Sequence, residues 1–287
     1  MTTTRRNGAE SDGDEREGAM TFGTVGDNTI DEYVGAEEVS FVGGNAINVA
    51  VRLAELGNLV SYFGAVGPDK RGAWVRKALV ERRVSIQHLL EIPGVTSTSQ
   101  VRVAPDGDRR LSSEEFGTSA DYRPTEQELA VLAGCGVVHI GWTPFAGEVR
   151  KALAGRGVVV AQDCAVSEGY DQLDIAFCSA GEDEQAARKL AREAIVGGAR
   201  LAVVTRGAAG SIAFDGARWW SQSALVVDVV DTTGAGDSFI AGYLSEMRNG
   251  GTVADCMAAG SAAAAETCQH RGGFKQAPIR IPEGSTR

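Results

Sequence analysis

The sequence DTTGAGDSF occupies residues 231–239 and is the most specific pattern in the chain. Residues 224–229 before it form an apolar run typical of a strand, and residues 236–248 have a helical pattern. The Gly-Ala-Gly turn is therefore predicted at a helix N-terminus, where unpaired backbone N–H groups and the helix dipole favour an anion. Gly234, Ala235 and Gly236 are predicted to bind a phosphate group, because glycines let it approach the backbone closely.

Asp237 lies directly beside this predicted anion site. A carboxylate there repels phosphate, but it makes chemical sense as a base that takes the proton from an attacking hydroxyl. A glycine-rich turn followed by an Asp that merely caps a helix is the alternative. The length of the string argues against that alternative.

A second glycine motif, GGNAINVA, occupies residues 43–50 and opens a predicted helix. Asn45 and Asn48 are three residues apart, so they share one face of that helix. Carboxamides both donate and accept hydrogen bonds, which suits the hydroxyl groups of a sugar. A helix capped by Asn, without any ligand, is the alternative.

Two further polar stretches follow predicted strands, at residues 26–31 and 204–210. Ligands of open α/β sheets bind at the carboxyl ends of the strands, so Asp31 is a candidate acceptor for two sugar hydroxyls. Simple turn chemistry explains the first stretch equally well. The second, VTRGAAG, is interpreted either as a turn that holds nucleotide phosphates or as a plain hairpin.

Apolar strand patterns alternate with amphipathic helix patterns along most of the chain, which predicts a parallel α/β sheet covered by helices. Strands are expected at 21–26, 59–65, 98–104, 137–140, 157–162, 174–178, 200–205, 211–214 and 224–229. Helices are expected at 44–57, 69–82, 124–133, 145–155, 182–197, 236–248 and 253–269. Short alternating strands at 32–42 and 97–111 break this rhythm, and we expect them to pair into a small antiparallel flap, or lid, over one end of the sheet.

Composition excludes several classes of protein. A formal net charge of -10 disfavours nonspecific binding to nucleic acid or to anionic lipid. Apolar runs fall short of the ~18 residues of a membrane helix, and five cysteines without a CxxC pair favour buried, reduced thiols in a cytoplasmic protein. Residues 1–19 are polar and predicted to be disordered, and we suspect that Met20 is the true start. With 37 glycines among 287 residues, the chain exceeds the usual ~7%.

Taken together, the early GGNAxN motif and the late DTxGAGD motif resemble the two signatures of the ribokinase-like (PfkB) carbohydrate kinases. The resemblance extends from residue 21 to about residue 274. It implies a three-layer α/β/α fold with a mostly parallel central sheet and a small β lid. The kinase domain would span 20–274, and 275–287 would form a C-terminal tail.

The resemblance also implies roles for individual residues. Asp237 matches the catalytic base, and Gly234, Ala235 and Gly236 match the anion hole for the transferred phosphoryl group. The positions that match sugar contacts are Asp31, Gly43, Gly44 and Asn48. Thr205 and Gly207 match the turn that binds nucleotide phosphates, and Glu182 matches the residue that organises Mg²⁺ through water. Ser179 stands where the family usually has Asn, next to the nucleotide.

Within this family, residues 24–33, 41–51 and 173–180 resemble the bacterial fructoselysine 6-kinases, including Ser at 179. The implied reaction is transfer of phosphate from ATP to the 6-hydroxyl of fructoselysine or a related fructosamine in the cytoplasm. A kinase for a plain sugar or nucleoside, such as a fructokinase, a ribokinase or an aminoimidazole riboside kinase, is the main alternative. The resemblance also allows a monovalent cation such as K⁺ near the late motif, and a homodimer.

Two other functional classes fit the sequence less well. A dinucleotide-binding oxidoreductase requires GxGxxG after the first strand, and Gly26-Asp27-Asn28 lacks it. A non-catalytic sugar-binding relative would have lost the base, whereas Asp237 is present.

Overall fold

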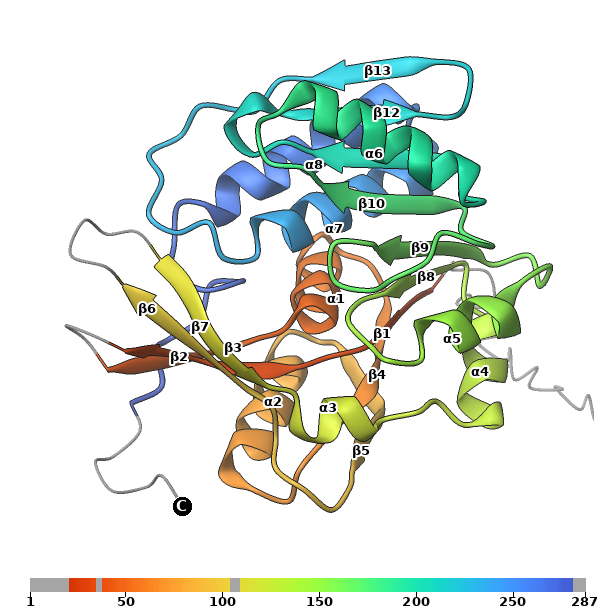
Figure 1. Cartoon of the computed structure of the whole chain (residues 1–287). Helices are drawn as coiled ribbons and strands as arrows, with labels where there is room; N and C mark the ends of the chain where they lie inside the picture. The colour runs from red at the N-terminus through yellow and green to blue at the C-terminus, as the bar shows by residue number, and fades with distance from the viewer. Residues whose placement is uncertain (1–20, 35–37, 104–108, 281–287) are drawn as a thin grey trace, which may run out of the picture.

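A nine-stranded sheet runs through the molecule in the order β13-β12-β11-β10-β9-β8-β1-β4-β5 (Figure 1). The structure, a computed structural model, describes residues 21–34, 38–103 and 109–280. Neighbouring strands are parallel except around β12 and β13, which pair antiparallel at one edge. Their bounds are β1 Phe22–Val25, β4 Val60–Val66, β5 Ser85–Glu91, β8 Val137–Ile140, β9 Val159–Asp163, β10 Ile175–Ser179, β11 Leu201–Thr205, β12 Ser211–Phe214 and β13 Trp219–Gln222.

Helices cover both faces of this sheet, so the expected three-layer α/β/α fold is confirmed (Figure 1). One apolar core joins the sheet to α1 Asn45–Glu55, α2 Lys70–Glu81, α7 Ala235–Arg248 and α8 Val253–Thr267. The core of the opposite face includes side chains of α4 Glu126–Ala133, α5 Ala146–Leu153 and α6 Glu184–Val196. Strands β1 and β8 are buried along their whole length, as continuous apolar runs predict. Among the described residues, every helix is too short or too polar to cross a bilayer.

The predicted strand at 224–229 is wrong. These residues form an irregular segment in which Leu225 is 52% and Val226 101% exposed. The prediction rested on their apolar character alone, and that character does not distinguish a buried strand from an exposed segment. The edge strand is instead β13, which a turn joins to β12. That turn is closed by Asp215, whose carboxylate accepts hydrogen bonds from the N–H groups of Ala217 and Arg218. Strand β5 was not predicted because this edge strand lacks the continuous apolar run of the inner strands, and Leu89 is its one buried residue.

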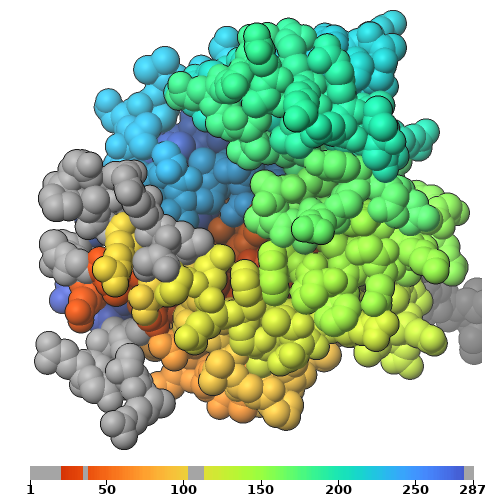
Figure 2. All heavy atoms as spheres, viewed as in Figure 1, coloured from red at the N-terminus to blue at the C-terminus, as the bar shows by residue number. Residues whose placement is uncertain are grey.

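The lid is a separate four-stranded sheet in the order β3-β2-β6-β7, and it lies beside the main sheet (Figure 1). Its strands are β2 Thr29–Val34, β3 Val39–Gly43, β6 Thr98–Val103 and β7 Arg109–Glu115. The expectation of an antiparallel flap is only partly right, because β2 and β6 pair parallel and join two antiparallel hairpins. The space-filling view shows a hollow between the lid strands and the green part of the chain (Figure 2).

The predicted disordered tail at 1–19 and the suspected start at Met20 lie outside the described residues. Of the predicted C-terminal tail, residues 275–280 are described and lie along β3. Gln276 donates to and accepts from the backbone of Val42, and Ile279 exchanges two backbone hydrogen bonds with Ser40. Residues 276–279 therefore pair along β3, on the outer side of the lid sheet. A short helix, α3 Gly117–Asp121, links β7 to the main body.

Candidate active site

Four carboxylates from distant parts of the chain meet where strands end and helices begin. Asp27 follows β1, Asp31 lies in β2, Asp163 ends β9, and Asp237 lies in the first turn of α7. Asp27, Asp31 and Asp163 are buried, and Asp237 is half-buried. The Asn45 amide joins Asp237 to Asp163. This position, at the carboxyl ends of parallel strands, is where open α/β sheets bind ligands.

Asp237 is held by two asparagine side chains of α1. Asn45 Nδ2 donates to its Oδ1 at 2.6 Å, and Asn48 Nδ2 donates to its Oδ2 at 2.7 Å. Burial raises the pKa of Asp237 well above that of an ordinary Asp, and the negative charges of Asp163 and Asp27 raise it further. The two amide hydrogen bonds favour the charged form and partly offset this effect. The result is a fixed carboxylate with an enhanced affinity for a proton, as a general base requires.

The helix that carries these asparagines begins at a glycine, and its capping group comes from Asp27. Gly44 has φ 108° and no side chain, and an added Cβ would lie 2.7 Å from Asn28 Cα. Asp27 Oδ2 accepts from the N–H of Asn45 at 2.9 Å, and Oδ1 accepts from that of Ala46 at 3.1 Å. Burial raises the pKa of Asp27 to about 6. Asp27 therefore fixes the first turn of α1 and, through it, both amides.

Asp31 lies on the lid, with its carboxylate over Gly43. A Cβ at Gly43 would lie 2.2 Å from Asp31 Oδ2, so any larger residue would displace the carboxylate. Burial raises the pKa of Asp31 to about 7, and the charges of Asp27, Asp231 and Glu114 contribute. The predicted sugar contacts Asp31, Gly43, Gly44 and Asn48 thus come from adjoining segments, β2, β3 and the start of α1.

A second region, beyond Asp237, is a pocket of about 490 Å³. Several residues predicted to bind the nucleotide or its phosphates line this pocket, namely Ser179, Thr205, Gly207, Ala235 and Gly236. The turn 206–210 connects β11 to β12 as a hairpin, which is one of the two interpretations that the sequence allowed, and its residues Gly207, Ala208 and Gly210 line the pocket. Binding of nucleotide phosphates there stays a prediction. Glu182 does not line it; this side chain is exposed in the turn between β10 and α6.

The start of α7 has the expected geometry for an anion site. Gly234 is left-handed, with φ 73°, and the first amide bonded within the helix is that of Ser238, to Gly234 O at 2.9 Å. The N–H groups of Gly236 and Asp237 precede it and stand at the positive end of the helix. Ala235 N donates to Thr232 O at 3.1 Å, so its amide is already used by the turn.

Asp231 connects this turn to the lid. Tyr33 of β2 donates its hydroxyl proton to Asp231 Oδ2 at 2.9 Å, and Gly272 N donates to the same oxygen at 3.0 Å. Asp231 Oδ1 accepts from Thr233 N at 3.0 Å. These hydrogen bonds lower the pKa of Asp231 despite its burial, so it stays ionised.

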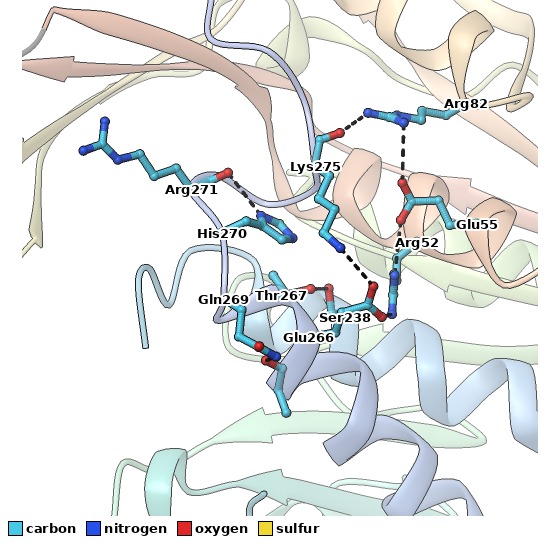
Figure 3. A network of polar contacts seen from close by, with 11 residues as sticks. Arg52, Glu55, Arg82, Ser238, Glu266, Thr267, Gln269, His270, Arg271 and Lys275 are labelled. Carbon is cyan, nitrogen blue, oxygen red and sulfur yellow. Dashed lines mark hydrogen bonds and ion pairs between the residues drawn. The ribbon is translucent and has the colours of Figure 1, made fainter. Parts of the chain in front are cut away.

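The segment after α8 closes one side of the site. A chain of polar contacts anchors it: Arg82, just after α2, pairs with Glu55 of α1, and Arg52 of α1 joins Glu55 to Glu266 of α8 (Figure 3). Lys275 of the segment then contacts Glu266. Ser238 of α7 and Thr267 of α8 share a hydrogen bond of 2.6 Å, and Arg82 also donates to the Lys275 carbonyl (Figure 3).

This segment brings Gly273 into contact with Asn48 of α1 and with Gly234. A Cβ at Gly273 would lie 2.3 Å from Asn48 Oδ1, and a Cβ at Gly234 would lie 2.5 Å from Gly273 Cα. The second glycine of the late Gly272-Gly273 pair is thus needed for close approach to Asn48.

Sequence reasoning missed several residues of this site. Asp163 and Asp27 both follow directly on buried parallel strands, which is the signal that could have identified them. Asn45 was noted for sugar binding, but here its amide binds Asp163 and Asp237. Tyr33 and Gly273 gave no signal, because their roles depend on contacts with residues far away in the sequence.

Comparison with known proteins agrees with this geometry. The profile of the pfkB family carbohydrate kinases matches residues 31–280. This chain belongs to that family. As a pfkB carbohydrate kinase it is a phosphotransferase with an alcohol group as acceptor, and kinases of this family use ATP.

Among characterised pfkB kinases, the fructoselysine 6-kinase of Shigella flexneri is 36% identical over 263 residues, which cover 88% of this chain and 99% of that protein. The fructosamine kinase FrlD of Bacillus subtilis is 30% identical over 279 residues, covering 93% and 98%. Arabidopsis thaliana ribokinase, solved with ribose and ATP, superposes with a TM-score of 0.81 at 23% identity, covering 88% of this chain and 94% of that one. This last similarity concerns the fold alone.

Proposed function

We propose that this pfkB kinase transfers the γ-phosphoryl group of ATP to the 6-hydroxyl of fructoselysine or a related fructosamine. The observation that carries the proposal is the position of Asp237. Its carboxylate accepts hydrogen bonds from the Asn45 and Asn48 amides of α1, and it follows directly on Gly236, which lines the pocket. The similarity to fructoselysine 6-kinase and to fructosamine kinase supports the choice of acceptor.

In this proposal, the sugar lies against Asp31, Gly43, Gly44 and Asn48, with its 6-hydroxyl directed at Asp237. Asp237 takes the hydroxyl proton, the sugar oxygen forms a bond to the γ-phosphorus, and the bond to the ADP oxygen breaks. Asn48 already holds one Asp237 oxygen, so it would fix the base and contact the sugar at the same time. Catalysis would come mainly from positioning and electrostatics.

The nucleotide would occupy the pocket of about 490 Å³, with its phosphates at Thr205, Gly207 and Ser179. At the turn Gly234-Ala235-Gly236, the N–H groups of Gly236 and Asp237, which precede the first hydrogen bond of α7, would stabilise charge on the γ-phosphoryl group. The apolar remainder of the lining suits a base ring, because it offers few polar groups.

The family resemblance assigns magnesium to Glu182, three residues after Ser179 of the pocket lining. Glu182 is an exposed carboxylate in the turn between β10 and α6, and a hard cation that keeps most of its waters suits such a ligand. Glu182 would therefore hold Mg²⁺ through water, and the ion would neutralise phosphate charge. A monovalent cation near residues 231–237 stays a prediction of the resemblance.

The charge of the sugar region also favours an aminated acceptor. A fructosamine carries a protonated secondary amine on C1, and four carboxylates, Asp27, Asp31, Asp163 and Asp237, surround this region. Phe116 and Trp142 stack on each other, with ring centroids 3.6 Å apart and an interplanar angle of 8°. The Trp142 backbone N–H is hydrogen-bonded to Asp27, so the backbone of this residue adjoins one of the carboxylates. We place the C1 substituent of the substrate against these rings, where its cation would be attracted to an aromatic face.

A coupled ADP-release assay tests this proposal with fructoselysine, other fructosamines, fructose, ribose and nucleosides at matched concentrations. We expect the highest kcat/KM with a fructosamine. A preference for a plain sugar or nucleoside would overturn the choice of acceptor and leave the kinase assignment intact.

A further inference from the structure

Asp163, the last residue of β9, lies next to the proposed base but has no part in the reaction described so far. Its carboxylate is 8% exposed. Oδ2 accepts a hydrogen bond of 2.7 Å from Asn45 Nδ2, and Oδ1 accepts one of 2.9 Å from the N–H of Ala165. The same Asn45 nitrogen donates to Asp237 Oδ1 at 2.6 Å. A single amide nitrogen thus uses both of its hydrogens to join two carboxylates.

The orientation of the Asn45 amide is fixed from its other end. Asn45 Oδ1 lies 3.3 Å from Nε2 of His139, a fully buried residue of β8. Burial lowers the pKa of His139 to about 3, so the ring is neutral at physiological pH and donates from Nε2 to the amide oxygen. Turning the amide over would place its oxygen between two carboxylates, with no hydrogen to bridge them. Asn45 can therefore present only its nitrogen to Asp237.

Among the described residues, the two charges that act most strongly on Asp237 are both negative. Asp163 faces it from β9 and Asp27 from the loop after β1, whereas α1 contributes only the neutral amides of Asn45 and Asn48 and β8 the neutral ring of His139. A negative charge one hydrogen-bonded amide away disfavours a second negative charge on Asp237 and so strengthens its hold on a proton.

We propose that Asp163 is a positioning residue for phosphoryl transfer, which locks the Asn45 amide against Asp237 and makes Asp237 a stronger base. This inference rests on the proposed function, because it assumes that Asp237 is the base. A purely structural Asp163 would not affect the pH at which the enzyme loses activity. In the proposed role, removing the charge of Asp163 changes that pH.

The test is the pH profile of kcat for Asp163→Asn, with saturating ATP and the best acceptor from the substrate panel. Asn at 163 keeps an oxygen that can accept from Asn45 but removes the charge. We expect the acidic limb of the profile to move to lower pH by on the order of one unit. We also expect kcat on the plateau to fall several-fold, because the base becomes weaker. Glu193→Gln, which removes an exposed carboxylate on α6, is the matched control and should leave the limb in place.

An acidic limb that stays in place in a folded, active Asp163→Asn enzyme would overturn the inference. The wild-type profile provides a second test that needs no variant, because a limb at the ordinary pKa of an exposed Asp, ~3.9, would also overturn it. Failure of the proposed function looks different. In that case the wild-type enzyme phosphorylates none of the fructosamines, or Asp237→Asn remains active.

Discussion

Asn48 Nδ2 donates a hydrogen bond of 2.7 Å to the carboxylate of Asp237, although the two residues are 189 positions apart in the chain. This contact joins the early glycine motif, which opens α1, to the late one, which opens α7. The group proposed to bind the sugar therefore also holds the group proposed to accept its proton. Changes in either motif should alter both sugar binding and turnover.

Replacing Asp237 by Asn should abolish most turnover while nucleotide binding persists. The variant lacks the base, and its NH₂ group would face the NH₂ groups of Asn45 or Asn48. We expect kcat to fall by about 10²–10⁴-fold. Calorimetric titration with ATP should give an affinity close to that of the wild type, since the pocket lining is unchanged. Activity within tenfold of the wild type would refute the role of Asp237.

Asp31 should make the protein less stable as the pH rises. Its pKa of about 7 in the folded state exceeds the 3.8 of an unperturbed Asp, so folding favours the protonated form. That contribution is complete below about pH 4 and is lost as the pH rises to about 7.

Asp31→Asn removes the cost of the buried charge. We expect it to raise the melting temperature by on the order of 5 °C at about pH 8, and to change it little at about pH 4. The same variant should raise KM for the sugar, because Asn offers one acceptor oxygen where the carboxylate offers two. An equal shift in melting temperature at both pH values would contradict the claim that burying the ionised Asp31 carboxylate destabilises the protein.

Gly273→Ala should impair catalysis without unfolding the protein. Its Cβ would lie 2.3 Å from Asn48 Oδ1, so the amide must move away from Asp237. We expect kcat/KM to fall by roughly tenfold or more, a loss of about 1.4 kcal/mol in transition-state binding. Gly147→Ala is the control, because the nearest atom to its Cβ is 3.6 Å away, in ordinary contact. Equal activities of the two variants would mean that Gly273 has no part in placing Asn48.

Trp142→Ala should reduce the preference for aminated sugars. The Trp142 ring stacks on Phe116, and the backbone N–H of Trp142 is hydrogen-bonded to Asp27. Loss of an attraction between a cation and an aromatic ring should lower kcat/KM for fructoselysine by about tenfold, and that for fructose much less. Parallel losses for both acceptors would show that the ring serves packing and not recognition of the C1 substituent.

Much of the fold could be predicted because buried parallel strands are continuously apolar and helices are amphipathic. Strand β8 was predicted with its observed bounds, Val137–Ile140. The prediction of a strand at 224–229 was wrong, because the apolar side chains of this segment are exposed along the pocket and do not pack in a sheet. The parallel pairing of β2 with β6 could not be predicted, because it depends on how two hairpins meet in space.

Residues of the candidate site could be predicted where they belong to a specific local sequence motif. Asp237 and the turn 234–236 belong to the motif DTTGAGDSF, and they lie at the start of α7. Asp163 and Tyr33 belong to no such motif. Their importance arises from contacts with Asn45 and Asp231, which only the folded chain brings near.

The most direct test of the central claim is ³¹P NMR of the product formed from ATP and fructoselysine by the purified protein. We predict a phosphate ester whose signal is split into a triplet by the two protons on C6, and no such signal with Asp237→Asn. A doublet from a secondary ester would contradict the 6-hydroxyl as acceptor. The absence of any ester from fructoselysine, under conditions in which fructose or ribose is phosphorylated, would contradict the function proposed here.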